Sequence, residues 1–204
     1  LHLFIYYIIC NFFKLFMAKI YIKITILLAI TGLHPSLYAS LSPYNDLNIV
    51  VDISEQRLYL LNDQLILHSY PISSSKYGEG STENSFKTPL GMHEIKRKIG
   101  DEAKLNSIFV ARTNTNKLAE IIKMDIDTED DHVTSRILWL DGKEEGVNRG
   151  KGIDSFQRYI YIHGTHEEGL IGKKASHGCI RMFNNDVVSL YEYVKEGTKV
   201  YIRA

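Results

Sequence analysis

Short runs of apolar residues, separated by polar stretches only as long as turns, dominate the chain from Leu47 onwards. Three of them follow in succession at 47–51, 57–61 and 65–70, and such a succession predicts a β-meander. Runs rich in branched and aromatic residues predict further strands at 91–95, 108–112, 137–140, 159–163 and 199–202. Because no helices alternate with these strands, the pattern favours a mainly antiparallel β-sandwich or barrel.

One segment near the carboxyl end has the spacing of a helix. Asn185 is a suitable N-cap, apolar residues recur at helical intervals as far as Val194, and Gly197 is suited to end the helix. The fold that the whole pattern predicts is therefore mainly β, with one or two short helices.

The segment 113–135 breaks the apolar pattern and holds five acidic residues between positions 125 and 131. A calcium loop of the EF-hand type would need a glycine at its sixth position and a glutamate at its twelfth, and both are missing here. We therefore expect this segment to be a solvated loop or a lid.

The first 33 residues are almost wholly apolar, and their three charges are all lysines. Such a segment is typical of an export signal or a membrane anchor. Met17 opens a typical export peptide, and a small residue at Ala39 suits cleavage there. We expect 1–39 to be a cleaved signal peptide or, alternatively, a retained anchor, and 40–204 to be one domain. Both alternatives place the domain outside the cytoplasm, in the periplasm or cell wall.

Composition and charge narrow the possible partners. The chain has 204 residues, 45% of them hydrophobic, which is enough for one sizeable core. Its 24 basic and 24 acidic residues cancel, and without 1–39 it would carry 21 basic and 24 acidic side chains. A chain with no basic surplus is poorly suited to neutralise a run of phosphates, so nucleic acid is not an expected partner.

The two cysteines lie far apart, and Cys10 falls within the apolar amino-terminal segment. The large Ile9 before Cys10 makes lipid attachment there unfavourable. Cys179 then has no partner for a disulfide bond, so it is either a buried inert thiol or a reactive one. It lies in the run ASHGCIRM at 175–182, sixteen positions after His163 in the run YIYIHGT.

Cysteine, histidine and loop glycines together supply a nucleophile, a base and oxyanion donors. Both His163 and His177 are possible bases, and we favour His163 because it can approach from a separate strand. The amides of Gly178 and Cys179 are candidate oxyanion donors. Arg181 is suited to bind a substrate carboxylate, so we expect Arg181→Ala to impair substrate use more than folding.

These runs resemble the signature of the L,D-transpeptidases of bacterial cell walls, whose catalytic domain is called YkuD-type. The resemblance rests on His-Gly-Thr at 163–165, on SHGCIRM at 176–182 and on Asn184 shortly after. The run KTPLG at 87–91 is similar to the Thr-Pro-x-Gly turn of that family. The resemblance covers about 47–202, nearly all of the expected domain.

The resemblance implies that 40–204 is an L,D-transpeptidase catalytic domain with Cys179 as nucleophile and His163 as base. Enzymes of this family cleave the L,D-peptide bond before the terminal D-alanine of a peptidoglycan stem tetrapeptide, through a thioacyl-enzyme. They pass the acyl group to an amine, and with water as acceptor the reaction is that of an L,D-carboxypeptidase. The implied partners are donor and acceptor stem peptides. No metal or cofactor is expected, and a monomer is favoured.

Further site residues follow from the same resemblance and from the strand pattern. Gly164 would orient His163 through its carbonyl group, and the alternating strand position of Tyr161 suits the lining of a cleft. The residues expected to support the reaction are Gly164, His177 and Gly178, and those expected to bind substrate are Ser176, Arg181 and Tyr161.

Three other interpretations remain open at this stage. His163, His166, His177 and Cys179 are all residue types that bind zinc, although no H-E-x-x-H helix is present. The run SSSK at 73–76 matches the S-x-x-K motif of serine enzymes, but helix-breaking glycines follow it. The third interpretation is an exported module that binds the wall without catalysis, or a hydrolase of another wall bond.

Overall fold

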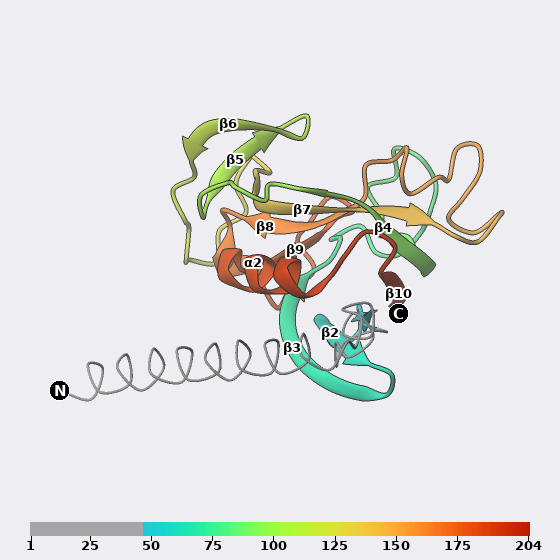
Figure 1. Cartoon of the computed structure of the whole chain (residues 1–204). Helices are drawn as coiled ribbons and strands as arrows, with labels where there is room; N and C mark the ends of the chain where they lie inside the picture. The colour runs from blue at the N-terminus through green and yellow to red at the C-terminus, as the bar shows by residue number, and fades with distance from the viewer. Residues whose placement is uncertain (1–46) are drawn as a thin grey trace, which may run out of the picture. The chain divides into compact units, whose positions relative to one another are not determined.

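A computed structural model describes residues 47–204, and strands make up most of its regular structure (Figure 1). The strands are β1 (Leu47–Asp52), β2 (Arg57–Asn62), β3 (Leu65–Ser73), β4 (Gly91–Ile99), β5 (Ser107–Val110), β6 (Thr113–Leu118), β7 (Val133–Gly142), β8 (Tyr161–Thr165), β9 (Ile180–Met182) and β10 (Lys199–Arg203). The helices of this part are the short 3-10 helix η2 (Glu168–Leu170) and the α-helix α2 (Asn184–Tyr193). The prediction of a mainly β fold is confirmed.

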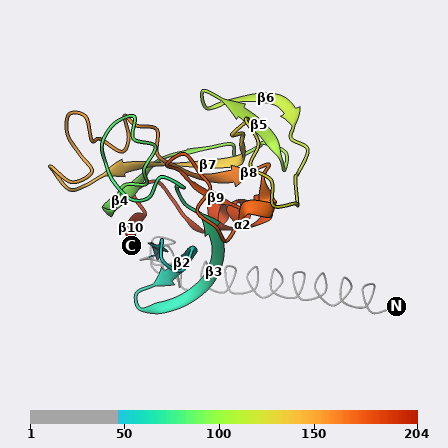
Figure 2. The same cartoon turned by 180° about the vertical axis from the view of Figure 1, so that it is seen from behind.

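Most of the strands form a closed ring. Hydrogen bonds link them in the order β4-β10-β1-β2-β3-β9-β8-β7, and a further pairing of β7 with β4 closes the ring. The β5–β6 hairpin pairs with β7 outside the ring and stands off it (Figures 1 and 2). Two pairings in the ring are parallel, β1 with β10 and β8 with β9. Closure gives each strand of the ring two neighbours, although only Ile72 and Ser73 of β3 pair with β9.

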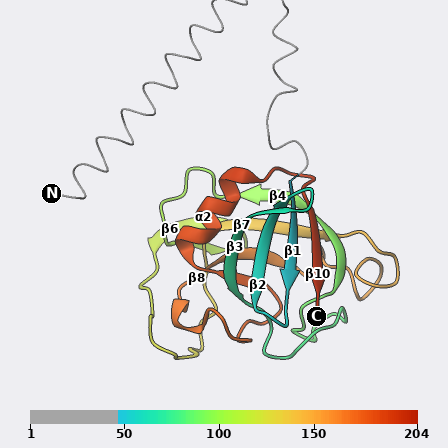
Figure 3. The same ribbon diagram turned by 90° about the horizontal axis from the view of Figure 1, so that it is seen from below.

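One apolar cluster spans the ring and α2. Alternate residues of β1 enter it, so Ile49 and Val51 are almost fully buried, while Figure 3 shows β1 side by side with β2, β3 and β10. The helix α2 packs against β7 and β8, and it buries Val187 and Leu190 in the same cluster. Each leucine buried in this way contributes about 1.5–3 kcal/mol. The core therefore holds β8, which leads to the candidate site, rigidly against the helix.

Two strands are not predicted by the apolar pattern, and both have physical reasons. β6 lies inside the polar segment 113–135, so this segment is not all loop, as expected, but partly an exposed strand paired with β5. An edge strand needs no apolar face. β9 has only three residues, too few to show a period.

The helix differs from its prediction at both ends. It begins at Asn184, with Phe183 in the capping position, and ends at Tyr193. Val194 is already extended, yet its side chain stays buried in the core. The apolar spacing continued beyond the helix because Val194 packs into the core without being helical.

The signal peptide or anchor expected at 1–39 lies outside the described residues. Of residues 47–204, none belongs to a helix that is long and apolar enough to cross a membrane.

Candidate active site

The predicted site residues meet where β8 and β9 lie side by side. The parallel register places His163 opposite Arg181, and Cys179, which immediately precedes β9, comes next to Tyr161. Side chains alternate along a strand, so these four share one face of the pair. Ile162, on the opposite face, is fully buried in the core. The ring thus anchors the strands from one side and leaves the other side for chemistry.

The sulfur of Cys179 lies between two backbone groups of the neighbouring segment. The amide of Tyr161 donates to Sγ at 3.4 Å, and the thiol lies 3.4 Å from the Tyr159 carbonyl, to which it can donate. Burial raises the pKa of the Cys179 thiol to about 12, although the charges of Arg181 and Arg158 act in the opposite direction. The thiol is therefore protonated at neutral pH, and a base is needed to activate it.

His163 has the protonation state that a base requires. Its Nδ1 lies 2.7 Å from the Gly164 carbonyl oxygen, and because a carbonyl only accepts, Nδ1 carries the proton. Burial lowers the pKa of His163, while the carboxylate of Asp131 acts in the opposite direction. The imidazole is therefore neutral at pH 7, and its Nε2 is the atom with a free lone pair.

Gly164 has no room for a side chain. A Cβ there would come within 2.5 Å of the Asn184 Oδ1 atom and 2.8 Å of the Thr134 carbonyl oxygen. Asn184 also ties α2 to β8, because its Nδ2 donates to the Thr165 carbonyl at 2.7 Å. The carbonyl that holds His163 is thus fixed between a helix start and a strand.

His177, the other candidate base, contacts the acidic loop and an aromatic ring. Its Nδ1 donates to Asp131 Oδ2 at 3.0 Å, and its ring meets the ring of Phe86 edge to face. Asp131 belongs to the acidic loop after β6, which is also held by an ion pair of 2.7 Å between Asp127 and Lys76. The acidic segment therefore docks on the site through specific contacts, which sequence reasoning did not predict.

Arg181 is buried and paired, rather than open to a ligand. Its side chain is 1% exposed, and its guanidinium lies 2.8 Å from Glu167 Oε2 and 2.7 Å from Asp131 Oδ2. Glu167 is itself 0% exposed. This arrangement differs from the expected open fork for a substrate carboxylate. The sequence signal for Glu167 is its place two residues after β8, close behind His163.

Ser176 shapes the nucleophile loop. It is fully buried, its Oγ donates to the Cys179 carbonyl at 2.6 Å, and the Gly178 amide donates to that Oγ at 3.2 Å. These hydrogen bonds lie within the loop, and the contact of Ser176 with substrate stays a prediction. The Gly178 amide is likewise engaged, so the Cys179 amide is the remaining candidate oxyanion donor. Thr88 of the Thr-Pro turn supports the loop by donating to the Gly178 carbonyl at 3.0 Å.

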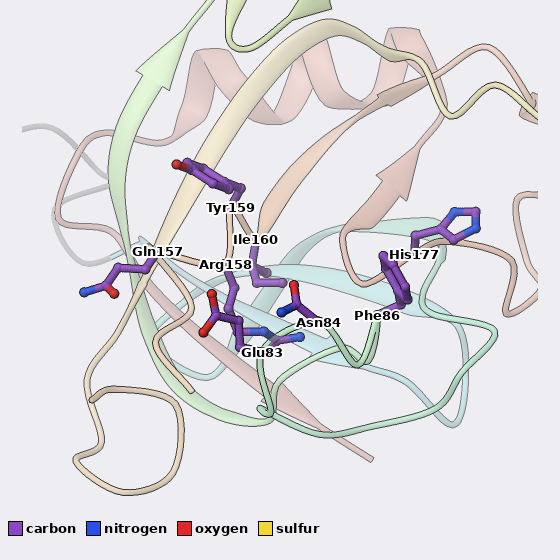
Figure 4. Close-up of a pocket in the computed structure, with 8 residues that line it drawn as sticks. All are labelled: Glu83, Asn84, Phe86, Gln157, Arg158, Tyr159, Ile160 and His177. Carbon is purple, nitrogen blue, oxygen red and sulfur yellow. The ribbon is translucent and has the colours of Figure 1, made fainter. Parts of the chain in front are cut away.

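A pocket of about 260 Å³ adjoins the nucleophile loop (Figure 4). Gly178 lies against two of its lining residues, because a Cβ there would come within 3.5 Å of the Phe86 carbonyl oxygen and 3.6 Å of the Ile160 side chain. The pocket-lining residues are Glu83, Asn84, Phe86, Gln157, Arg158, Tyr159, Ile160 and His177. A peptide segment bound there would lie beside the thiol.

Neither the zinc site nor the S-x-x-K motif has a matching geometry among residues 47–204. Within this range, no three His, Cys, Asp or Glu side chains are grouped as metal ligands. The ring of His166 instead lies tilted against the ring of His132, and its Nε2 lies 3.2 Å from Thr128 Oγ1. In the S-x-x-K run, the serine of the motif is Ser73, which is the last residue of β3 rather than the start of a helix.

The Asp131 carboxylate predicts an acid-sensitive contribution to stability. Burial alone would raise the pKa of Asp131, but Arg181 and the hydrogen bond from His177 outweigh burial and lower that pKa to about 2. A depressed pKa stabilises the fold above the unfolded value of about 4, and the contribution is lost as pH falls towards 2. We expect this loss to be roughly 2 kcal/mol.

Urea unfolding of the wild type and of Asp131→Asn, measured between pH 6 and pH 2.5, tests this expectation. The stability difference between the two proteins should shrink as the pH falls, because the asparagine variant has no carboxylate to titrate. A difference that stays constant across the range would show that Asp131 is not the responsible group.

Comparison with known proteins gives one match across the domain and several shorter ones. The family model described as "L,D-transpeptidase catalytic domain", YkuD, matches residues 47–202. A protein of Bacillus subtilis (strain 168) named as a candidate L,D-transpeptidase, YqjB, is 48% identical over 52 residues, which are 26% of this chain and 28% of that protein. A second protein of the same strain, YkuD, is named in the same way. It is 54% identical over 46 residues, which are 22% of this chain and 28% of that protein.

Solved structures show weaker likeness. An L,D-transpeptidase from Mycobacterium smegmatis has 18% identity and a TM-score of 0.47, with 78% of this chain and 59% of that chain covered. L,D-transpeptidase 3 from Mycobacterium tuberculosis, solved with a faropenem-derived adduct, has 16% identity and a TM-score of 0.48, with 78% and 60% covered. The match to the family model spans about three quarters of the chain, and the chain therefore belongs to the family of YkuD-type L,D-transpeptidase catalytic domains.

Proposed function

We propose that this protein is an exported L,D-transpeptidase in which Cys179 is the nucleophile and His163 the general base. Its donor substrate is a peptidoglycan stem tetrapeptide, and the bond cleaved precedes the terminal D-alanine. The observation that carries the proposal is the pair of a protonated, half-buried thiol and a neutral imidazole whose Nδ1 is held by the Gly164 carbonyl. Family membership supports the reaction class.

The reaction begins with proton transfer. His163 Nε2 takes the thiol proton as Sγ attacks the carbonyl carbon of the third stem residue. The amide of Cys179 stabilises the oxyanion that forms. The intermediate collapses, the nitrogen of D-alanine takes the proton from the imidazolium, and D-alanine leaves. The third residue is then held as a thioester on Cys179.

The second half uses the same groups in reverse. An acceptor amine attacks the thioester carbonyl while His163 Nε2 removes a proton from its nitrogen. Sγ leaves and regains a proton from His163, which restores the neutral pair. With water as the acceptor, the same steps give an L,D-carboxypeptidase.

Export and assembly are parts of the same proposal. The apolar segment 1–39 supports export to the periplasm or wall, as a cleaved signal or a retained anchor. We propose a monomer that acts on stem peptides without a metal or cofactor, because Cys179 and His163 provide the nucleophile and the base that the reaction needs.

Mass spectrometry of the purified protein with a disaccharide tetrapeptide tests the function, with Cys179→Ala as the matched control. We expect the wild type to release D-alanine and form a cross-linked dimer, and the variant to do neither. Release without a dimer would identify a carboxypeptidase. A folded wild type that releases no D-alanine would contradict the proposal and favour a wall-binding module or a hydrolase of another bond.

A further inference from the structure

Three arginines lie near the site, and they differ in the groups that their guanidinium contacts. Arg181 is paired with two carboxylates. Arg112 lies over the rings of Trp139 and Tyr159, 4.8 and 4.7 Å from their centroids. Arg158 donates to two backbone carbonyl groups, those of Gly80 at 3.3 Å and Lys87 at 2.7 Å.

Arg158 therefore has no carboxylate of the described domain in direct contact, although the charge of Glu83, which lines the same pocket, acts to raise the pKa of Arg158. Among residues 47–204, the ion pairs involve neither Arg158 nor Arg112. Arg158 is half-buried, and burial lowers its pKa. A guanidinium has five N–H donors, and the two carbonyl groups leave several of them free. A half-buried charge with no carboxylate in direct contact and with free donors favours binding of an anion.

The place of this charge decides which anion it can meet. Arg158 lines the pocket beside Glu83 and Asn84, with Phe86 and His177 further along (Figure 4). It directly precedes Tyr159, whose carbonyl lies 3.4 Å from the thiol. Its charge also acts to lower the pKa of Cys179. Arg112, in contrast, is covered on two sides by aromatic rings and does not line the pocket.

We infer that Arg158 binds the terminal carboxylate of the acyl-donor peptide and thereby positions the scissile bond at Cys179. This inference rests on the proposed function, because it assigns the carboxylate of the leaving residue to a particular side chain. That carboxylate is one residue away from the attacked carbonyl, a span of about 3.3–3.6 Å along an extended chain. The pocket adjoins the nucleophile loop through His177 and the segment before β8 through Tyr159 and Ile160. Arg181, already paired, is left as a structural residue.

Binding measurements test this inference apart from catalysis. Calorimetry on the inactive Cys179→Ala protein would compare a tetrapeptide that ends in a carboxylate with the same peptide ending in a carboxamide. The carboxylate should bind about tenfold to a hundredfold more tightly, the range expected for hydrogen bonds to a charged group. Adding Arg158→Gln should abolish this preference, because it should weaken binding of the carboxylate peptide and leave binding of the carboxamide peptide unchanged. Adding Arg158→Lys, which keeps the charge, should retain part of it.

Two further variants separate the inference from its rivals. Arg149→Gln removes a surface charge that pairs with Glu145 away from the pocket, and it should leave the preference unchanged. The inference is overturned if Arg112→Gln abolishes the preference instead. It also fails if Arg158→Gln weakens both peptides equally, since that result would assign Arg158 only to holding the 80–88 loop.

Measuring D-alanine release beside peptide binding distinguishes a failure of this inference from a failure of the proposed function. Wild-type protein that releases D-alanine while Arg158→Gln keeps the full preference would overturn the role of Arg158 and leave the function standing. Wild-type protein that binds the carboxylate peptide with an Arg158-dependent preference, but releases no D-alanine, would support the role of Arg158 and contradict the function.

Discussion

Cys179→Ser is expected to release D-alanine from a stem tetrapeptide at least about a thousandfold more slowly than the wild type. A serine hydroxyl is far less acidic than a thiol, and His163 is a weak base because burial lowers its pKa. The smaller oxygen would also sit further from the Tyr161 amide, which now lies 3.4 Å from Sγ. The rate is measured by mass spectrometry under single-turnover conditions, where trapping of a thioester on the wild type can be followed directly.

The fold should tolerate this change. Cys179 is packed at the edge of a small apolar cluster with Tyr161 and Ile137, so we expect thermal unfolding of Cys179→Ser close to that of the wild type. Cys179→Ala serves as the matched control, with the nucleophile removed altogether. Substantial turnover by the serine variant, above that of the alanine variant, would contradict the assignment of Cys179 as the nucleophile.

Arg181→Ala is expected to lose roughly 3–5 kcal/mol of the free energy of unfolding. The change leaves the Glu167 carboxylate, which is 0% exposed, without the guanidinium that lies 2.8 Å away. An uncompensated charge in the interior costs far more than an exposed one. This expectation replaces the one drawn from the sequence, in which Arg181→Ala affects substrate use more than folding.

Urea unfolding of matched variants measures the effect. The double variant Arg181→Met with Glu167→Gln should recover much of the loss, because it removes both charges together. Arg149→Ala is the exposed control, and its pair with Glu145 should contribute less than about 1 kcal/mol. An Arg181→Ala protein as stable as the wild type would show that Glu167 is neutralised in another way, for example by taking up a proton.

The strands of the core could be predicted because each carries its own local signal. Apolar runs at β1, β2 and β10 are long enough to show which residues face inward. β9 could not be predicted in this way, since three residues show no period and its partner β3 is distant along the chain. Parallel pairing of β1 with β10 leaves no local trace at all.

Some residues of the candidate site could likewise be predicted from the sequence, and others could not. Cys179 and His163 stand out because cysteine, histidine and glycine in those runs are rare in an apolar core. Asp131 lies in a segment that reads as solvated, and only the folded chain brings its carboxylate to His177 and Arg181. Whether an arginine binds a ligand or a buried carboxylate depends on such distant partners, so residue type alone suggested the wrong surroundings for Arg181.

The closed ring joins the first strand of the domain to the last. β10 lies between β1 and β4, which means that residues about 150 positions apart in the chain must meet before the ring is complete. Folds rich in such distant contacts have high contact order and fold in milliseconds to seconds rather than microseconds. Until β10 has joined, β1 and β4 each present an unpaired edge. During synthesis these two edges are therefore available to pair with other chains until Arg203 has been added.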